Sequence, residues 1–172
     1  MASRVFEETV LPHLDAAFNY ARWLTRTDED AEDVVQDACV RAMRFFSSLR
    51  GEDARSWLFT IVRNTWYSRL SRRSTITALP LDSTNHPADG TLNPEARLLQ
   101  QQAVARVREA LEELPVEFRE VLVLREFEGM SYKEIAAVTR VPIGTVMSRL
   151  ARARDRLSAV LKSSPVAMER VP

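Results

Sequence analysis

The segment 131–157 reads SYKEIAAVTRVPIGTVMSRLARARDRL and contains two helical patterns separated by a very short corner. Ser131 and Glu134 have the spacing of a capping box, in which both side chains accept hydrogen bonds from backbone N–H groups at the helix start. The second helix is expected to begin at Pro142 or at the next residue. Two helices joined by so short a turn are typical of the helix-turn-helix motif, whose second helix lies in the major groove of DNA. Arg140 stands where this turn often has glycine, and a positive φ there would carry a modest strain.

The second helix of this segment carries more polar side chains than a buried helix could accommodate. Val146 and Leu150 recur at helical spacing and would anchor it to the rest of the fold. The side chains that cannot all be buried with them are Thr145, Met147, Ser148, Arg149, Ala151, Arg152, Arg154 and Arg156. We therefore interpret the motif as a DNA reader. The alternative is a basic amphipathic helix in a plain bundle.

The 172-residue chain has an ordinary globular composition, with 45% apolar and 28% charged residues. Its apolar runs are too short to span a membrane, and its N-terminus lacks the apolar centre of a signal peptide, so we expect a cytoplasmic protein without membrane insertion. Cys39, His13 and His86 offer no disulfide and no metal-ligand spacing, so no metal or other cofactor is predicted. No catalytic triad or glycine-rich phosphate loop indicates an enzyme.

The formal net charge of zero hides three blocks of one sign. Segment 28–37 holds six acids and no base, and segment 54–74 holds five arginines and no acid. Segment 140–162 holds six bases against one acid. Because solvated helix faces usually mix their signs, this segregation predicts one acidic and two basic interaction surfaces.

The sequence predicts an all-α fold of two small helical domains. Segment 74–94 contains three prolines, one glycine and many short polar residues, a composition that cannot bury enough surface to order itself. We place an N-terminal domain at 1–74, a flexible linker at 75–93 and a C-terminal domain at 94–172. A structureless loop inside one compact domain is the alternative.

Apolar periodicity indicates three main helices in the N-terminal part. The first is expected to be one amphipathic helix with Phe6, Val10, Leu14, Phe18 and Ala21 on its apolar face. The second, capped by Thr27 or Asp28, should bury Ala31, Val34, Val35, Ala38 and Met43. The third should bury Leu58, Ile61, Val62 and Thr65, with Phe59, Arg63, Asn64, Trp66, Tyr67 and Arg69 on its other sides. Aromatic and arginine side chains together suit a surface that grips phosphates and stacks on unpaired bases, although Trp57 and Trp66 could instead pack in the core.

The C-terminal part opens with a strong helix-start signal, in which Asn93 can cap, Pro94 occupies the first helical position and Glu95 follows. A second helix should begin after Pro115 and end near Gly129. The apolar stripe predicted for the first helix consists of Ala96, Leu99, Ala103, Val107, Ala110, Leu111 and Leu114.

Taken together, these motifs resemble the extracytoplasmic-function (ECF) sigma factors of bacterial RNA polymerase over nearly the whole chain. DAEDVVQDACVRA is similar to their polymerase-binding helix, and RSWLFTIVRNTWYSRLSRR to their minus-ten-reading helix. LPVEFREVLVLREFEGMSYKEIAAVTRVPIGTVMSRLARARDRL is similar to their minus-thirty-five-reading domain. Each motif alone is moderately specific, whereas the three in this order are highly specific. The resemblance implies core polymerase and promoter DNA as partners, and usually an anti-sigma factor.

The resemblance also implies site residues. Asp33, Gln36 and Asp37 match positions that dock on the clamp of the polymerase largest subunit, and Arg41 and Arg44 extend that face. The loop 49–55 and Asn64 match positions that hold a flipped minus-ten base. The minus-ten candidates are Arg50, Arg55, Arg63, Asn64, Trp66, Tyr67 and Arg69.

In the recognition helix, Met147, Ser148, Ala151 and Arg152 match base-facing positions. Gly144, Thr145, Arg149 and Arg154 match positions that hold phosphates. Arg152 is the best direct reader because a guanidinium pairs bidentately with guanine. Many relatives have a basic residue in place of Met147, which can make only apolar contacts. The alternative function is a helix-turn-helix repressor or activator that does not bind polymerase, but it leaves the acidic block and the arginine–aromatic helix unexplained.

Overall fold

The computed structural model describes residues 2–51, 53–74 and 93–163 of the chain. Regular structure in these ranges is helical, which confirms the predicted all-α fold. The predicted linker lies outside the described residues, except for Asn93 at its end. The elements are α1 (Ala2–Val10), a 3-10 turn η1 (Leu11–His13), α2 (Leu14–Thr25), α3 (Asp28–Phe45), a 3-10 turn η2 (Phe46–Ser48), α4 (Ala54–Arg73), α5 (Pro94–Glu112), α6 (Val116–Leu122), a π-helical turn η3 (Val123–Phe127), α7 (Tyr132–Thr139) and α8 (Ile143–Ser163).

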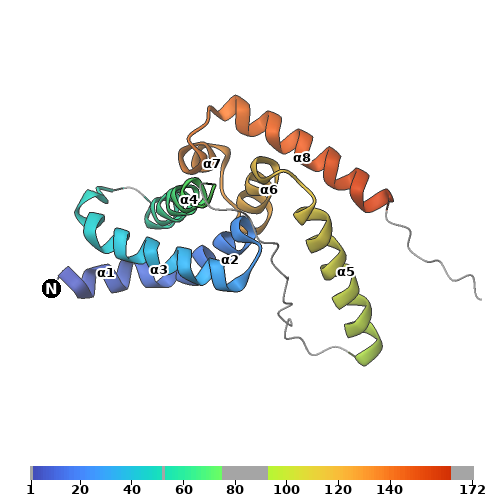
Figure 1. The fold of residues 1–172 in the computed structure, drawn as a ribbon, viewed down its shortest axis with the longest axis horizontal. Helices are drawn as coiled ribbons and strands as arrows, with labels where there is room; N and C mark the ends of the chain where they lie inside the picture. Colours follow the sequence, from blue (N-terminus) through green and yellow to red (C-terminus); the bar gives the residue numbers. More distant parts are fainter. Residues whose placement is uncertain (1, 52, 75–92, 164–172) are drawn as a thin grey trace, which may run out of the picture.

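The helices form two lobes that touch. The N-terminal lobe consists of α1 to α4, in which α2, α3 and α4 pack against one another, and the C-terminal lobe consists of α5 to α8. Figure 1 shows α6 and α7 between the N-terminal lobe and the long helices α5 and α8. Helix α7 packs on α4, and α6 packs on α2. The buried apolar residues of both lobes consequently form one contiguous core.

Local sequence signals set the helix starts. The Thr27 hydroxyl accepts a hydrogen bond from the backbone N–H of Asp30 and begins α3. Asn93 caps α5 immediately before Pro94. The capping box of Ser131 and Glu134 is present at the start of α7. These predicted caps are confirmed because each depends on residues within three positions of one another.

The prediction of a single first helix is wrong. Its apolar spacing continues across Pro12, but the chain forms α1, the turn η1 and then α2. Proline has no N–H group to donate, and its ring clashes with the preceding helical turn, so the helix is interrupted there.

The predicted core of the N-terminal lobe is partly wrong. Met43 is 62% exposed, and Ala42 occupies the buried position of that turn, four residues after Ala38. In α4 the buried face also includes Phe59, which is predicted on another side, and Trp66, for which the core alternative holds. The reason is that α4 packs against α2 and α3 and also against α7, so more of its circumference is buried than a single amphipathic stripe.

The apolar stripe predicted for α5 is buried only at its end. Leu99 is 64% exposed and Val107 is also exposed. Ala110 and Leu111 are buried, as is Leu114 just beyond the helix. Among the described residues, α5 thus packs on α8 through its C-terminal half, where Arg106 also donates to the backbone carbonyl of Leu161.

Two further findings concern the described ranges as a whole. None of their helices is long and apolar enough to cross a membrane. Within the same ranges, no group of three or more histidine, cysteine, aspartate or glutamate side chains is placed to hold a metal ion.

An ion pair ties the start of α3 to the end of α4, and its loss is expected to weaken the N-terminal lobe. Arg73 donates to both carboxylate oxygens of Asp30, at 2.7 and 3.3 Å. These hydrogen bonds from Arg73 hold the pKa of the Asp30 carboxyl below its ordinary value, against the opposing effect of burial. Asp30→Asn should lower the free energy of unfolding by about 1 kcal/mol at neutral pH, because Arg73 is half-exposed and the pair is partly screened.

The pH dependence of this effect follows from the direction of the shift. A carboxyl with a lowered folded-state pKa stabilises the fold above its unfolded pKa and loses that contribution as the pH falls through the folded pKa. The difference between wild type and Asp30→Asn in urea unfolding should therefore shrink below about pH 4. Asp155→Asn, at an exposed position of α8, is the control and should change little. An equal difference at all pH values would contradict the ionic origin.

Candidate functional site

One face of α3 carries the predicted docking residues, and we call Asp33, Gln36 and Asp37 the acidic stripe. All three are exposed on the same side of the helix. Arg69 of α4 reaches this stripe, with one nitrogen 2.6 Å from a carboxylate oxygen of Asp37 and another 3.4 Å from Asp33. Both carboxylates remain about half-exposed. Pairs of this kind contribute at most about 1 kcal/mol, so the stripe stays available to a basic partner.

Arg41 and Arg44 continue the same face of α3 one and two turns beyond Asp37. Arg44 is exposed and Arg41 is half-buried. Residues three or four apart on a helix are neighbours, so these side chains extend the acidic stripe into one polar surface of mixed sign.

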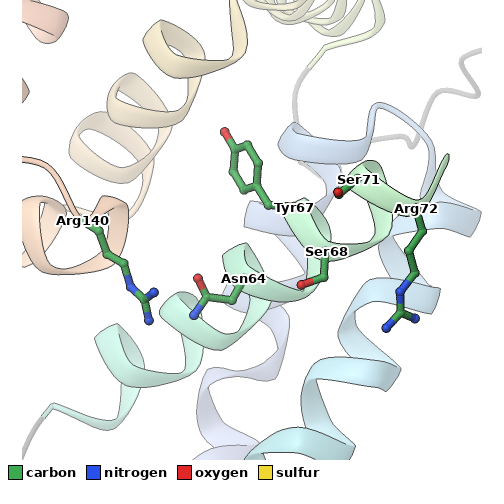
Figure 2. A pocket seen from close by; sticks show the side chains of 6 residues that line it. All are labelled: Asn64, Tyr67, Ser68, Ser71, Arg72 and Arg140. Atoms are coloured by element: carbon green, nitrogen blue, oxygen red, sulfur yellow. The ribbon is translucent and has the colours of Figure 1, made fainter. Parts of the chain in front are cut away.

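The polar face of α4 forms one wall of an open pocket of about 600 Å³. The opposite wall comes from Arg140, in the turn between α7 and α8, whose side chain is directed toward Asn64 (Figure 2). No acidic side chain lines this pocket, so it favours polar or anionic ligands. Its lining residues are Asn64, Tyr67, Ser68, Ser71, Arg72 and Arg140.

Arg63 does not face solvent as a free cation. Its guanidinium binds the Glu120 carboxylate of α6 at 2.6 and 3.3 Å and stacks over the ring of Tyr67, 4.5 Å from the ring centroid. Burial is the largest single influence and disfavours the charged guanidinium, but the hydrogen bonds to Glu120 and the nearby negative charge together outweigh it and raise the pKa of Arg63. The Tyr20 hydroxyl of α2 also donates to Glu120, at 2.5 Å. Burial, together with the Glu120 charge, raises the pKa of Tyr20 well above its ordinary value.

The other minus-ten candidates differ in how much of each side chain is exposed to solvent. Arg50 is exposed, in the loop before α4. Arg55 is half-buried and donates to the backbone carbonyl of Glu128 at 2.8 Å. Trp66 is only 9% exposed and belongs to the core, so its ring is not available for base stacking in this conformation. The structure thus brings Asn64 and Tyr67 together on one pocket wall, whereas Arg69 lies beside the acidic stripe.

The condition named for strain in the turn of the helix-turn-helix motif is met. Arg140 has φ 57° and ψ 40°, in the left-handed region that favours glycine. Val146, Leu150 and Ala153 anchor α8 on the C-terminal lobe. The predicted reading residues on the opposite side include the exposed Gly144, Met147, Ser148, Ala151, Arg152 and Arg154 and the half-buried Thr145 and Arg149.

The cations of α8 differ in their surroundings. Arg154 binds Glu126 at 2.8 Å on the surface, and Arg156 stacks over Phe118 at 4.8 Å. For Arg152, no partner is found among the residues that the structure describes. An exposed guanidinium without an internal partner can meet a base edge without first breaking a contact.

Sequence reasoning missed Glu120 and Tyr20. Arg119 and Glu120 are two charged residues between Phe118 and Val121, inside an apolar segment, and both are buried. Their place in an apolar segment could have indicated a buried ion pair, because a charged side chain is rarely buried without a partner. Its partners could not be found from the sequence, since Tyr20 lies 100 positions away.

Comparisons with known proteins agree with this arrangement. Residues 9–76 match the family model for Sigma-70 region 2, and residues 105–157 match that for Sigma-70, region 4. The chain is 33% identical over 168 residues to the RNA polymerase sigma-H factor of Pseudomonas aeruginosa, covering 92% of this chain and 87% of that protein. It is 37% identical over 137 residues to the ECF RNA polymerase sigma-E factor of Escherichia coli K12, covering 74% and 72%.

A solved structure shows the same likeness. The sigma factor RpoE of Bartonella quintana, solved in complex with the anti-sigma factor NepR, matches with a TM-score of 0.77 and 32% identity. The match covers 94% of this chain and 99% of that one. With both sigma-70 regions present in order and this identity over most of the chain, the protein belongs to the extracytoplasmic-function sigma factors of RNA polymerase.

Proposed function

We propose that this sigma factor divides its work among three surfaces. The acidic stripe on α3 docks on the clamp of the polymerase largest subunit. The pocket wall on α4 holds a flipped base of the minus-ten strand, and the exposed face of α8 reads the minus-thirty-five element. The observation that carries the proposal is that α8 is amphipathic. Its anchor residues are buried, and its predicted reading residues lie mainly on the exposed side.

The chemistry of each surface suits its partner. Two carboxylates and an amide at i, i+3 and i+4 form a compact acceptor surface for a basic helix. The amide of Asn64 can donate to and accept from the edge of an extruded base, and Tyr67 offers a ring close by for stacking. On α8, Arg152 can bind guanine, whereas Met147, 53% exposed, can contact the methyl group of thymine.

The proposed partners also indicate where this sigma factor acts and how it is controlled. A sigma factor is a non-enzymatic initiation factor, and this one acts in the cytoplasm, where polymerase and promoters are found. The complex of the Bartonella quintana relative with NepR supports control of this chain by an anti-sigma factor of its own. A repressor or activator that does not bind polymerase is not favoured, because region 2 is present beside the DNA-binding region.

Asn64→Ala tests the minus-ten assignment. The variant should bind core polymerase normally but open promoters several-fold less, because the lost contact exists only once a base has left the helix. The measurement is permanganate footprinting of reconstituted holoenzyme on one of its own promoters, in duplex and in pre-melted form. Asn19→Ala, an exposed asparagine of α2, is the matched control. Loss on both templates still fits a base reader, whereas unchanged opening on both would remove Asn64 from the site.

A further inference from the structure

A buried carboxylate joins the two lobes. Glu120 of α6 is 1% exposed, and its side-chain partners among the described residues are Tyr20 and Arg63, both from the N-terminal lobe. We call this cluster the Glu120 latch. Within the C-terminal lobe, the described residues provide no hydrogen-bond donor for this carboxylate. Glu120 is therefore satisfied only while the lobes are together.

The latch suits a reversible contact. Burying a carboxylate costs desolvation free energy, which its partners must offset. The net gain of a buried ion pair over the two hydrated ions is therefore small. When the lobes separate, water can replace Arg63 as the partner of Glu120 and Glu120 as the partner of Arg63. The pair thus helps to fix how the lobes fit together but adds little to the free energy that holds them closed.

The contact occupies part of the surface assigned to the minus-ten strand. Arg63 is engaged by Glu120, and Tyr67 lies beneath the Arg63 guanidinium. Arg140 of the C-terminal lobe faces Asn64 across the pocket (Figure 2). At the other end of α4, Arg55 donates to the Glu128 carbonyl of the C-terminal lobe. The start and the middle of α4 are therefore held by the lobe proposed to read the minus-thirty-five element.

The contact between Glu120 and Arg63 has the geometry with which arginine binds a phosphate. Arginine binds carboxylates and phosphates with the same two-pronged geometry, and Glu120 takes two nitrogens of Arg63 in this way. We propose that the C-terminal lobe is an internal competitor of the promoter strand, with Glu120 in the place of a DNA phosphate at Arg63. This inference rests on the proposed minus-ten role of α4. It adds that the free protein must open between α4 and α6 before single-stranded DNA can bind.

Two substitutions weaken the latch from opposite lobes. Glu120→Gln removes the charge and keeps the shape of the side chain. Tyr20→Phe removes one donor and retains the ring, which stacks on Phe59 at 5.1 Å. Glu8→Gln is the matched control, because Glu8 pairs with Arg4 on the surface of α1 and touches neither lobe boundary nor DNA surface.

The full chain is measured in two ways after helical circular dichroism has confirmed folding. Small-angle X-ray scattering gives the radius of gyration, and fluorescence anisotropy gives the affinity for a short labelled single-stranded DNA of mixed sequence. Both latch variants should be more expanded than wild type and the control, and should bind the strand several-fold more tightly. If Glu120→Gln does not fold, Tyr20→Phe alone decides the result.

Any other result of these two measurements contradicts a specific part of the proposal. Unchanged radii would show that Glu120 does not hold the lobes together. Expanded variants with unchanged strand affinity would show that closure does not compete with DNA. The scattering measurement uses no DNA, and the Asn64→Ala footprint uses holoenzyme, so failure of the latch and failure of the minus-ten assignment are distinguishable.

Discussion

Replacing Asp33, Gln36 and Asp37 together with alanine is expected to abolish co-purification with core polymerase while leaving the helical circular dichroism unchanged. The three side chains are exposed, so no core contact is lost, and alanine is a good helix former. Slight fraying of α3 can follow, because acids near a helix start favour its dipole. Docking should suffer far more, since the basic groups of the polymerase would lose their counter-charges on desolvation.

The structure supplies a control for this experiment. The variant also removes both ion pairs of Arg69, and this effect must be separated from the loss of the acids. Arg69→Ala breaks the same pairs but leaves the carboxylates in place, so it should keep polymerase binding. Normal binding by the triple variant would remove the docking assignment. If wild-type protein failed to bind polymerase at all, the repressor interpretation would become the better one.

The second large effect is expected at Arg152. Arg152→Ala should weaken binding of holoenzyme to the preferred promoter by roughly 1–3 kcal/mol, which is about 5- to 150-fold, and relax the preference at one upstream position. The exposed guanidinium lies on the predicted base-facing side of α8. Arg149→Ala should instead weaken all sequences evenly and lower the salt slope by about one unit, because a phosphate contact carries no sequence information.

The two variants are compared by titrating holoenzyme against a promoter library at several salt concentrations. The expected pattern is a position-specific loss for Arg152→Ala and a uniform, salt-dependent loss for Arg149→Ala. If both variants weakened every sequence alike, Arg152 would not be a base reader.

The sequence by itself determined the local architecture of this protein. Helix starts at Thr27, Asn93 and Ser131 were predictable because capping joins residues within three positions. The short turn before α8 was also predictable, and Arg140 in it could be singled out as a residue that a positive φ would strain. The all-α class followed from periodicity. The exception is Pro12, which interrupts the first helix although the apolar spacing continues across it.

Tertiary structure alone decided which side chains are free to act. Trp66 has an aromatic ring suited to base stacking, but α4 packs on several neighbouring helices and buries this ring. Arg69 is predicted to bind the minus-ten element, but it pairs with Asp37 of another helix. Glu120 meets Tyr20 across 100 positions of sequence. Such pairings depend on how completed helices pack, and apolar packing is non-directional, so no local pattern of residues can specify them.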